Sequence, residues 1–314
     1  MRGVIVNTDY EWFAFLRERA PLDEVNFWQP SGRGPFHDEP PGTPFFFRLK
    51  KPYEAIGGFA VFAHASTLPA WLAWESFGEA NGAPDFAAMV SRIDRYRRTR
   101  ERDPLGRYPI GCLMLSQPVF FDESEWIEQP ANWGQQTVVG RHEDLTAGEG
   151  RRIYEACLAR MRDDIVAESA GLIARGDEID RARFGNAVLV RPRLGQGTFR
   201  VAVTDAYGRA CTVTGEHSLP ALDAAHIKPY SAGGEHAVHN GLLLRSDIHR
   251  LFDKGYVTVS GDFRFEVSRR LKDDFENGRS YYPLQGRRIC LPGNEAEYPD
   301  RVALAWHADN VFLG

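Results

Sequence analysis

Four side chains in the C-terminal third of the chain have types and spacing suited to metal-dependent chemistry. His249 and Asp253 are four residues apart, so on a helix both side chains lie on one face. Two side chains that chelate one cation from a single helical turn require this spacing. His226 and Asn240 precede them. If a hairpin carrying His226 folds back over the helix, it brings the imidazole to the cation.

The elements that must position these residues are short. Residues 219–230 predict the first strand of a hairpin, and residues 231–241 predict its loop. Residues 242–255 predict a second strand followed by a helix, and 257–271 another hairpin. Each candidate alone has an ordinary explanation, because a lone histidine usually packs in a core and Asn-Gly is a common turn. Their joint order and spacing favour a ββα metal site.

From about residue 195 onward the chain resembles the HNH nucleases, also called ββα-metal nucleases, and among them the predicted bacterial restriction endonucleases. The shared features are His-Ile-x-Pro, a Gly-Gly loop, Asn-Gly before an apolar strand, and His-Arg-Leu-Phe-Asp in a helix. The resemblance implies that His226 is the general base for water and that Asn240 braces the loop and orients this base. It also implies that His249 and Asp253 bind one divalent ion, Mg²⁺ or Mn²⁺, which stabilises charge on the attacked phosphate.

Two positions depart from the family pattern. Many members carry a His or Asp ligand directly before the general base, where this chain has Ala225. Asp223 lies on the same face of an extended strand as Ala225, so we expect Asp223 to be the third ligand, directly or through water. Zinc-bracketed relatives carry a paired-cysteine motif where this chain has residues 211–215. We therefore expect no structural zinc.

Basic residues form two sets of candidate phosphate contacts, although a solvated surface explains either set equally well. One set flanks the HNH motif: Lys228, Arg245 and Arg250. The other lies in residues 92–107, which hold seven arginines against three acids and include Arg95, Arg97 and Arg98. His236 and His239 match no motif, and we expect both to be ordinary loop residues.

The N-terminal half combines short predicted strands with many aromatic residues. We expect strands near 24–30, 43–52, 57–66, 108–121 and 135–141, and helices near 68–78 and 85–96. Residues 20 to 145 resemble the PUA-like superfamily, which includes the EVE, ASCH and SRA-type readers. These are small pseudo-barrels, some of which flip a modified base into an aromatic pocket. The resemblance makes Trp28, Phe46 and Trp74 candidate pocket walls, while simple core packing is the ordinary explanation for most of the aromatic residues.

Bulk properties set the frame for these motifs. The 314 residues suggest two domains, and 43% apolar with 26% charged residues is typical of soluble globular proteins. We expect no membrane span and a cytoplasmic location. The net charge of −5 neither favours nor excludes nucleic-acid binding. We expect an α+β fold with a PUA-like pseudo-barrel over 1–145, a helical linker over 146–194 and the HNH domain over 195–314.

Together these features predict a modification-dependent restriction endonuclease. Its first domain would bind double-stranded DNA with a modified base, with 5-substituted cytosine as the expected mark, and its HNH domain would cut nearby. One such site cuts one strand, so duplex cleavage implies a dimer or two independent events, and we expect a homodimer. Two alternatives stay open: an HNH nuclease whose N-terminal domain senses a protein or nucleotide signal, and a non-catalytic DNA reader in which Ala225 marks a decayed site.

Overall fold

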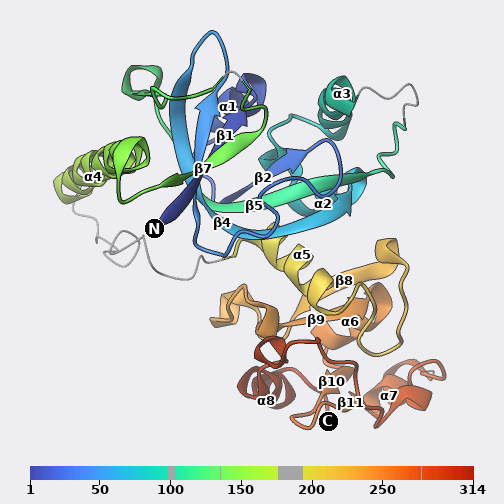
Figure 1. Ribbon diagram of the computed structural model, residues 1–314. Helices are drawn as coiled ribbons and strands as arrows, with labels where there is room; N and C mark the ends of the chain where they lie inside the picture. The colour runs from blue at the N-terminus through green and yellow to red at the C-terminus, as the bar shows by residue number, and fades with distance from the viewer. Residues whose placement is uncertain (98–102, 135, 176–193, 277) are drawn as a thin grey trace. The chain divides into compact units, whose positions relative to one another are not determined.

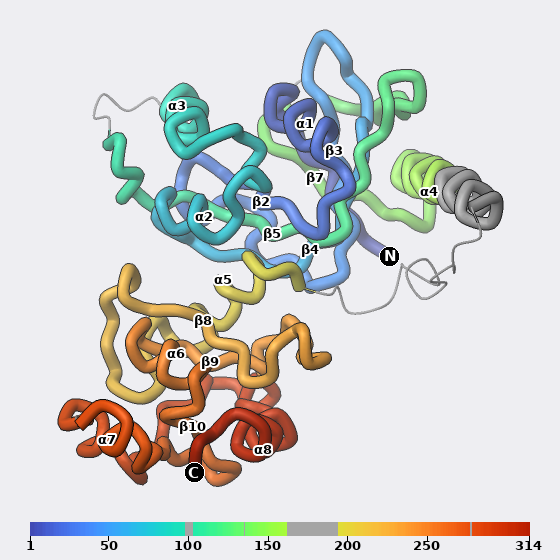
Figure 2. The backbone as a smooth tube through the Cα atoms, turned by 180° about the vertical axis from the view of Figure 1, so that it is seen from behind, coloured from blue at the N-terminus to red at the C-terminus, as the bar shows by residue number. Residues whose placement is uncertain are grey.

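The computed structural model describes residues 1–97, 103–134, 136–175, 194–276 and 278–314. The chain divides into two compact units, Met1–Pro192 and Arg193–Gly314. Figures 1 and 2 show each unit from opposite sides. Within the described ranges, no helix has both the length and the apolar character needed to cross a membrane.

The first unit is built on a seven-stranded mixed sheet (Figure 1) with the order β2-β5-β4-β3-β1-β7, and β6 is paired to β4. Only β1 and β3 run parallel, and the other described pairs are antiparallel. The edge strands β2 and β7 are not paired with each other in the described residues, and the pseudo-barrel stays a prediction. The strands are β1 (Arg2–Thr8), β2 (Glu24–Gln29), β3 (Pro44–Leu49), β4 (Ala55–Pro69), β5 (Pro109–Phe120), β6 (Ile127–Glu128) and β7 (Gly140–Asp144).

Helices of the first unit cover both faces of this sheet, and the alternation along β3 shows how. Phe45 and Phe47 pack in one hydrophobic core with α1, whereas Phe46 packs in a second core with Ile153 and Cys157 of α4. Phe46 has no exposed surface, which argues against the prediction that it lines a base pocket. The helices are α1 (Tyr10–Arg17), α2 (Ala70–Phe77), α3 (Phe86–Arg97) and α4 (Gly148–Arg175).

The second unit is built around two short hairpins and the helices packed on them. The first hairpin pairs β8 with β9, and α6 follows β9 directly, as the sequence predicted. The second hairpin pairs β10 with β11. The elements are α5 (Gln196–Ala206), β8 (Leu222–His226), β9 (Gly241–Arg245), α6 (Ser246–Asp253), β10 (Val257–Val259), β11 (Phe265–Val267), α7 (Arg270–Phe275) and α8 (Arg301–Asn310).

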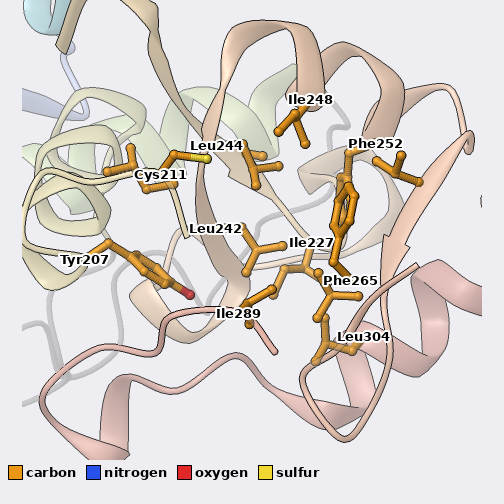
Figure 3. Close-up of a cluster of buried hydrophobic side chains, with 14 of the residues drawn as sticks. Tyr207, Cys211, Ile227, Leu242, Leu244, Ile248, Phe252, Phe265, Ile289 and Leu304 are labelled. Carbon is orange, nitrogen blue, oxygen red and sulfur yellow. The ribbon is translucent and has the colours of Figure 1, made fainter. Parts of the chain in front are cut away.

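A single hydrophobic core holds β9 and α6 in place in the second unit. Figure 3 shows Leu242 and Leu244 of β9 beside Ile248 and Phe252 of α6, all of them fully or almost fully buried. Leu304 of α8 belongs to the same cluster. Because these apolar faces are buried, the opposite, polar face of α6 is directed away from the core, and it carries the candidate metal ligands.

Candidate functional site

The imidazole of His226 is supported by the helix that precedes the hairpin. His226 ends β8 opposite Gly241 of β9, and its ring stacks on Phe199 of α5 with centroids 3.9 Å apart and planes 13° apart. A Cβ added to Gly241 would lie 2.5 Å from Cγ2 of Val203 and 3.0 Å from Cζ of Phe199. The glycine therefore lets β9 pass close beneath α5, which keeps Phe199 against the histidine.

His226 is held in its neutral form by its surroundings. Burial, followed by the charges of His236 and His249, lowers the pKa of His226 to about 4. At neutral pH the ring therefore has one nitrogen with a free electron pair, as a general base requires.

A second histidine contacts His226 directly. Nδ1 of His236 lies 2.9 Å from Nε2 of His226, and the His236 ring stacks on Tyr230 with centroids 4.8 Å apart and planes 9° apart. We expected His236 to be an ordinary loop residue. Its position ten residues after His226, in a loop that follows a 3-10 turn, carries no periodic signal that could have revealed this contact.

The side chain of Asn240 braces the hairpin loop by binding backbone groups of that loop. Its Oδ1 accepts a hydrogen bond from the Lys228 amide at 2.9 Å, and its Nδ2 donates to the carbonyls of Lys228 and Glu235, each at 2.9 Å. The residue is 4% exposed, so these groups replace water almost completely. In the described residues the Asn240 side chain has no hydrogen bond to the His226 ring, and it acts on the loop that surrounds this ring.

The predicted metal ligands lie together on the other face of β8 and on α6. Nδ1 of His249 is 3.5 Å from Oδ2 of Asp223, and Nε2 of His249 is 3.4 Å from Oδ2 of Asp253. The imidazole thus lies between the two carboxylates. The two faces of β8 therefore present the two functions separately, with His226 against α5 and Asp223 towards α6.

These donors fit a hard divalent cation that keeps much of its water. Two ligand atoms on one octahedral Mg²⁺, each about 2.1 Å from the ion, are roughly 3 Å apart. Both nitrogen-to-oxygen distances at His249 are only slightly longer than this. The described residues hold no group of three histidine, cysteine or acidic side chains around one point, and the two nitrogens of one ring cannot bind the same ion. A single ion would therefore join His249 to one carboxylate, and the other carboxylate would turn or act through water.

The three candidate phosphate-binding side chains of the second unit differ in whether they already have a partner within the protein. Arg250 is exposed on α6, and the ammonium of Lys228 lies 5.7 Å from the centre of the Trp306 ring. Arg245 binds both carboxylate oxygens of Asp247 at 2.7 Å, and this contact lowers the pKa of Asp247 to about 2. The guanidinium of Arg245 is already paired, which makes it the weakest of the three as a phosphate ligand.

Two aromatic candidates for a base pocket remain in the first unit. Trp28 is half-buried, and its Nε1 donates to the carbonyl of Asn81 at 3.0 Å. Trp74 is also half-buried, with its ring 6.3 Å from that of Phe86. Each therefore keeps part of its ring surface exposed, which Phe46 does not.

Two of the arginines predicted to bind the DNA backbone make contacts with other residues of the first unit. Arg95 pairs with Glu11 at 2.9 Å, and the Arg97 guanidinium lies 3.9 Å from the centre of the Tyr108 ring. Arg98 lies outside the described residues. These two contacts reach residues outside the run, and the binding of a DNA backbone by these arginines stays a prediction.

Comparisons with known proteins locate the family resemblance within the second unit. The model of the HNH endonuclease family matches residues 211–260, and no curated protein matches the chain. Among solved structures, a chain described as a "Modification dependent TagI restriction endonuclease" is 12% identical, with a TM-score of 0.27, over 92% of this chain and 75% of that one. The family match spans the β8–β9 hairpin and α6, and this chain therefore carries an HNH endonuclease domain and is a DNA endonuclease.

Proposed function

We propose that the chain is a modification-dependent restriction endonuclease whose HNH domain hydrolyses phosphodiesters with His226 as general base. The observation that carries the catalytic part is the His226 imidazole, stacked on Phe199, on the same strand as Asp223, whose carboxylate lies 3.5 Å from His249. His249 in turn is flanked by two carboxylates. A proton acceptor and a cation-binding face on one short hairpin are the two components that hydrolysis of a phosphodiester needs.

In the proposed reaction His226 takes a proton from a water molecule as the water oxygen forms its bond to phosphorus. The bond from phosphorus to the 3′ oxygen breaks, and the departing oxygen takes up a proton from solvent. The products are a 5′-phosphate and a 3′-hydroxyl, so no covalent protein intermediate is required. Lys228 and Arg250 hold the neighbouring phosphates and keep the scissile bond in register.

HNH nucleases generally use a divalent metal ion. Asp223, His249 and Asp253 are the residues that would hold it, and we expect Mg²⁺ or Mn²⁺. When bound, such an ion stabilises negative charge on the attacked phosphate and on the departing oxygen. Asp223 is part of the proposal because the position directly before the base, Ala225, is fully buried and has no donor atom.

Recognition of the modified base is assigned to the first unit. An HNH site built from backbone-phosphate contacts has little means to read a base, so selectivity must come from another surface. The half-buried rings of Trp28 and Trp74 support this assignment, because stacking on an extruded base offsets the few kcal/mol that flipping costs. We propose 5-substituted cytosine as the mark, and double-stranded DNA as the substrate.

Matched plasmids test this function. The full-length chain is incubated with one plasmid prepared unmodified, with 5-methylcytosine, with 5-hydroxymethylcytosine and with N6-methyladenine, each in Mg²⁺ and in Mn²⁺. We expect cleavage of at least one cytosine-modified plasmid and little cleavage of the unmodified one. Equal rates on all four plasmids would remove the reader function and leave the nuclease.

Cutting both strands takes either two HNH sites or two successive cuts by one site, and we propose that the protein acts as a homodimer on DNA. Sedimentation of the chain with a cleavable modified duplex tests this. A species containing two chains per duplex is expected. A single chain on DNA that is nevertheless cut on both strands would contradict the dimer.

A further inference from the structure

The loop that follows β8 places a second imidazole against the proposed base. Nδ1 of His236 and Nε2 of His226 are 2.9 Å apart, and one hydrogen atom must lie between them. Two arrangements satisfy this contact. Either His226 carries the proton on Nε2 and donates it, or His236 carries the proton on Nδ1 and His226 accepts it.

The two arrangements differ in whether His226 keeps a nitrogen electron pair that can accept a proton from water. If neutral His226 donates from Nε2, its Nδ1 has a free electron pair and can accept a proton. If His226 accepts at Nε2, its own proton is on Nδ1 and the ring offers water no base. Within the part of the chain that the structure describes, Nδ1 of His226 has no hydrogen-bond partner, so this atom remains available.

We propose that His236 is the positioning residue of this site: its Nδ1 accepts the Nε2 proton of His226 and thereby keeps the Nδ1 electron pair of His226 available to water. This inference rests on the proposed role of His226 as the base. After His226 has taken the proton from water, both of its nitrogens carry hydrogen, and Nε2 keeps its contact with Nδ1 of His236.

The surroundings of His236 are built to hold that geometry. Its ring lies parallel to Tyr230, which fixes the ring plane, and it is tilted by 55° against Phe199 with centroids 5.8 Å apart. The peptide before it is tied down as well, because the Glu235 carbonyl accepts a hydrogen bond from Asn240. Phe199 therefore contacts both imidazoles, and Asn240 reaches the base through the loop that carries His236.

The loop backbone leaves little freedom for this arrangement to shift. A Cβ added to Gly234 would lie 1.9 Å from the carbonyl oxygen of Lys228 and 2.9 Å from Nδ2 of Asn240. The glycine allows the loop to cross the chain just after β8 at the distance that brings His236 over His226. Any side chain at residue 234 would push the loop away from the base.

Two substitutions separate the hydrogen bond from the packing. His236→Phe keeps an aromatic ring against Tyr230 and removes the acceptor. His236→Asn removes the ring and keeps an acceptor oxygen near the place of Nδ1. His239→Phe, three residues further along the same loop, is the matched control, since no described contact joins the His239 side chain to His226. The rate is measured on the plasmid that the wild-type chain cuts, together with His226→Ala.

We expect His236→Phe to lower kcat by about 10- to 100-fold, the size typical of an outer partner that fixes the tautomer of a functional histidine. KM for DNA should change little, His236→Asn should recover most of kcat, and the control should match the wild type. If His236→Phe keeps the wild-type kcat while His226→Ala is inactive, the positioning role is wrong and the base remains. If His226→Ala still cuts, the proposed function itself fails.

Nitrogen-15 NMR of histidine-labelled full-length protein provides a readout that packing alone would not change. The His226 signals are assigned by their loss in His226→Ala. The proposal requires Nε2 of His226 to be protonated and Nδ1 to be unprotonated at neutral pH, with a mixture of tautomers in His236→Phe. A wild-type spectrum with the proton on Nδ1 of His226 would overturn the proposal whatever the rates are.

Discussion

Nδ1 of His249 lies 3.5 Å from Oδ2 of Asp223, which joins the first strand of the hairpin to the helix after the second. This distance matters because the position before the base, Ala225, has no donor atom. A carboxylate two residues earlier reaches the same helix face because strand side chains alternate. We therefore propose Asp223 as the source of the donor that Ala225 lacks.

Replacing Asp223 tests whether its carboxylate binds the metal ion. We expect Asp223→Asn to weaken Mn²⁺ binding and to lower kcat by at least the roughly 10- to 100-fold seen when outer-shell partners are lost. Isothermal titration with Mn²⁺ and plasmid nicking measure the two effects. Asp262→Asn is a suitable control, because Asp262 is an exposed acid that pairs only with Ser260 and Arg264 in the described residues. Unchanged Mn²⁺ affinity in Asp223→Asn would exclude Asp223 as a ligand.

The loop brace at Asn240 gives a prediction about stability as well as rate. In Asn240→Asp the side chain keeps its shape, but the carboxylate oxygen that replaces Nδ2 faces the carbonyls of Lys228 and Glu235. Leaving such buried groups without partners costs about 1–3 kcal/mol. Urea unfolding should show a loss of at least that size, and cleavage should fall with it. A variant as stable as the wild type would show that the brace contributes little.

The phosphate contacts are separable by their dependence on salt. Removing one lysine or arginine that neutralises a phosphate lowers the slope of log affinity against log salt by about 1. We expect this for Lys228→Ala and for Arg250→Ala in binding titrations without metal. Arg264→Ala should leave the slope unchanged, because Arg264 pairs with Asp262 on a separate turn. Slopes equal to that of the wild type for both variants would place DNA elsewhere.

Acid should destabilise the second unit through a buried histidine that holds α6. His307 is 2% exposed, stacks on Phe252 at 3.7 Å and contacts the Phe252 carbonyl through Nε2 at 3.1 Å. Burial lowers its pKa to about 4. An unfolded histidine titrates near 6.5, so between these values the unfolded chain binds more protons and stability falls as the pH falls.

The slope of stability against pH measures this effect. One histidine contributes up to about 1.4 kcal/mol for each pH unit in that window. His307→Asn should be less stable at pH 7.5 than the wild type, but its free energy of unfolding should fall less between pH 6.5 and pH 4.5. Parallel curves for the two proteins would mean that His307 does not stay neutral in the folded state.

Much of the hairpin and helix could be predicted because their patterns are local. The alternation around Asp223 and His226, the Asn-Gly turn and the spacing of His249 and Asp253 each depend on neighbours within a few residues. Their elements appear in the structure where they were expected. The strands of the first unit near residues 24–30 and 108–121 were predictable for the same reason.

The parts that could not be predicted depend on contacts between distant segments. The sequence did not lead us to predict strand β1 or helix α1. The strand expected at 135–141 begins only at Gly140. The burial of Phe46 could not be predicted because the sequence cannot tell which face of β3 is covered by α4. The pairing of Arg245 with Asp247 could not be predicted because it is an i,i+2 contact across the start of a helix. His236 was missed because only the folded loop brings it to His226.

Plasmid nicking by His226→Ala tests the central claim most directly. The variant and the wild type are compared on the same cleavable plasmid in Mg²⁺, with DNA affinity measured separately without metal. Loss of a general base typically costs about 10²- to 10⁴-fold in rate. We predict a fall of that size with DNA affinity unchanged. Cleavage by His226→Ala at the wild-type rate would contradict the account.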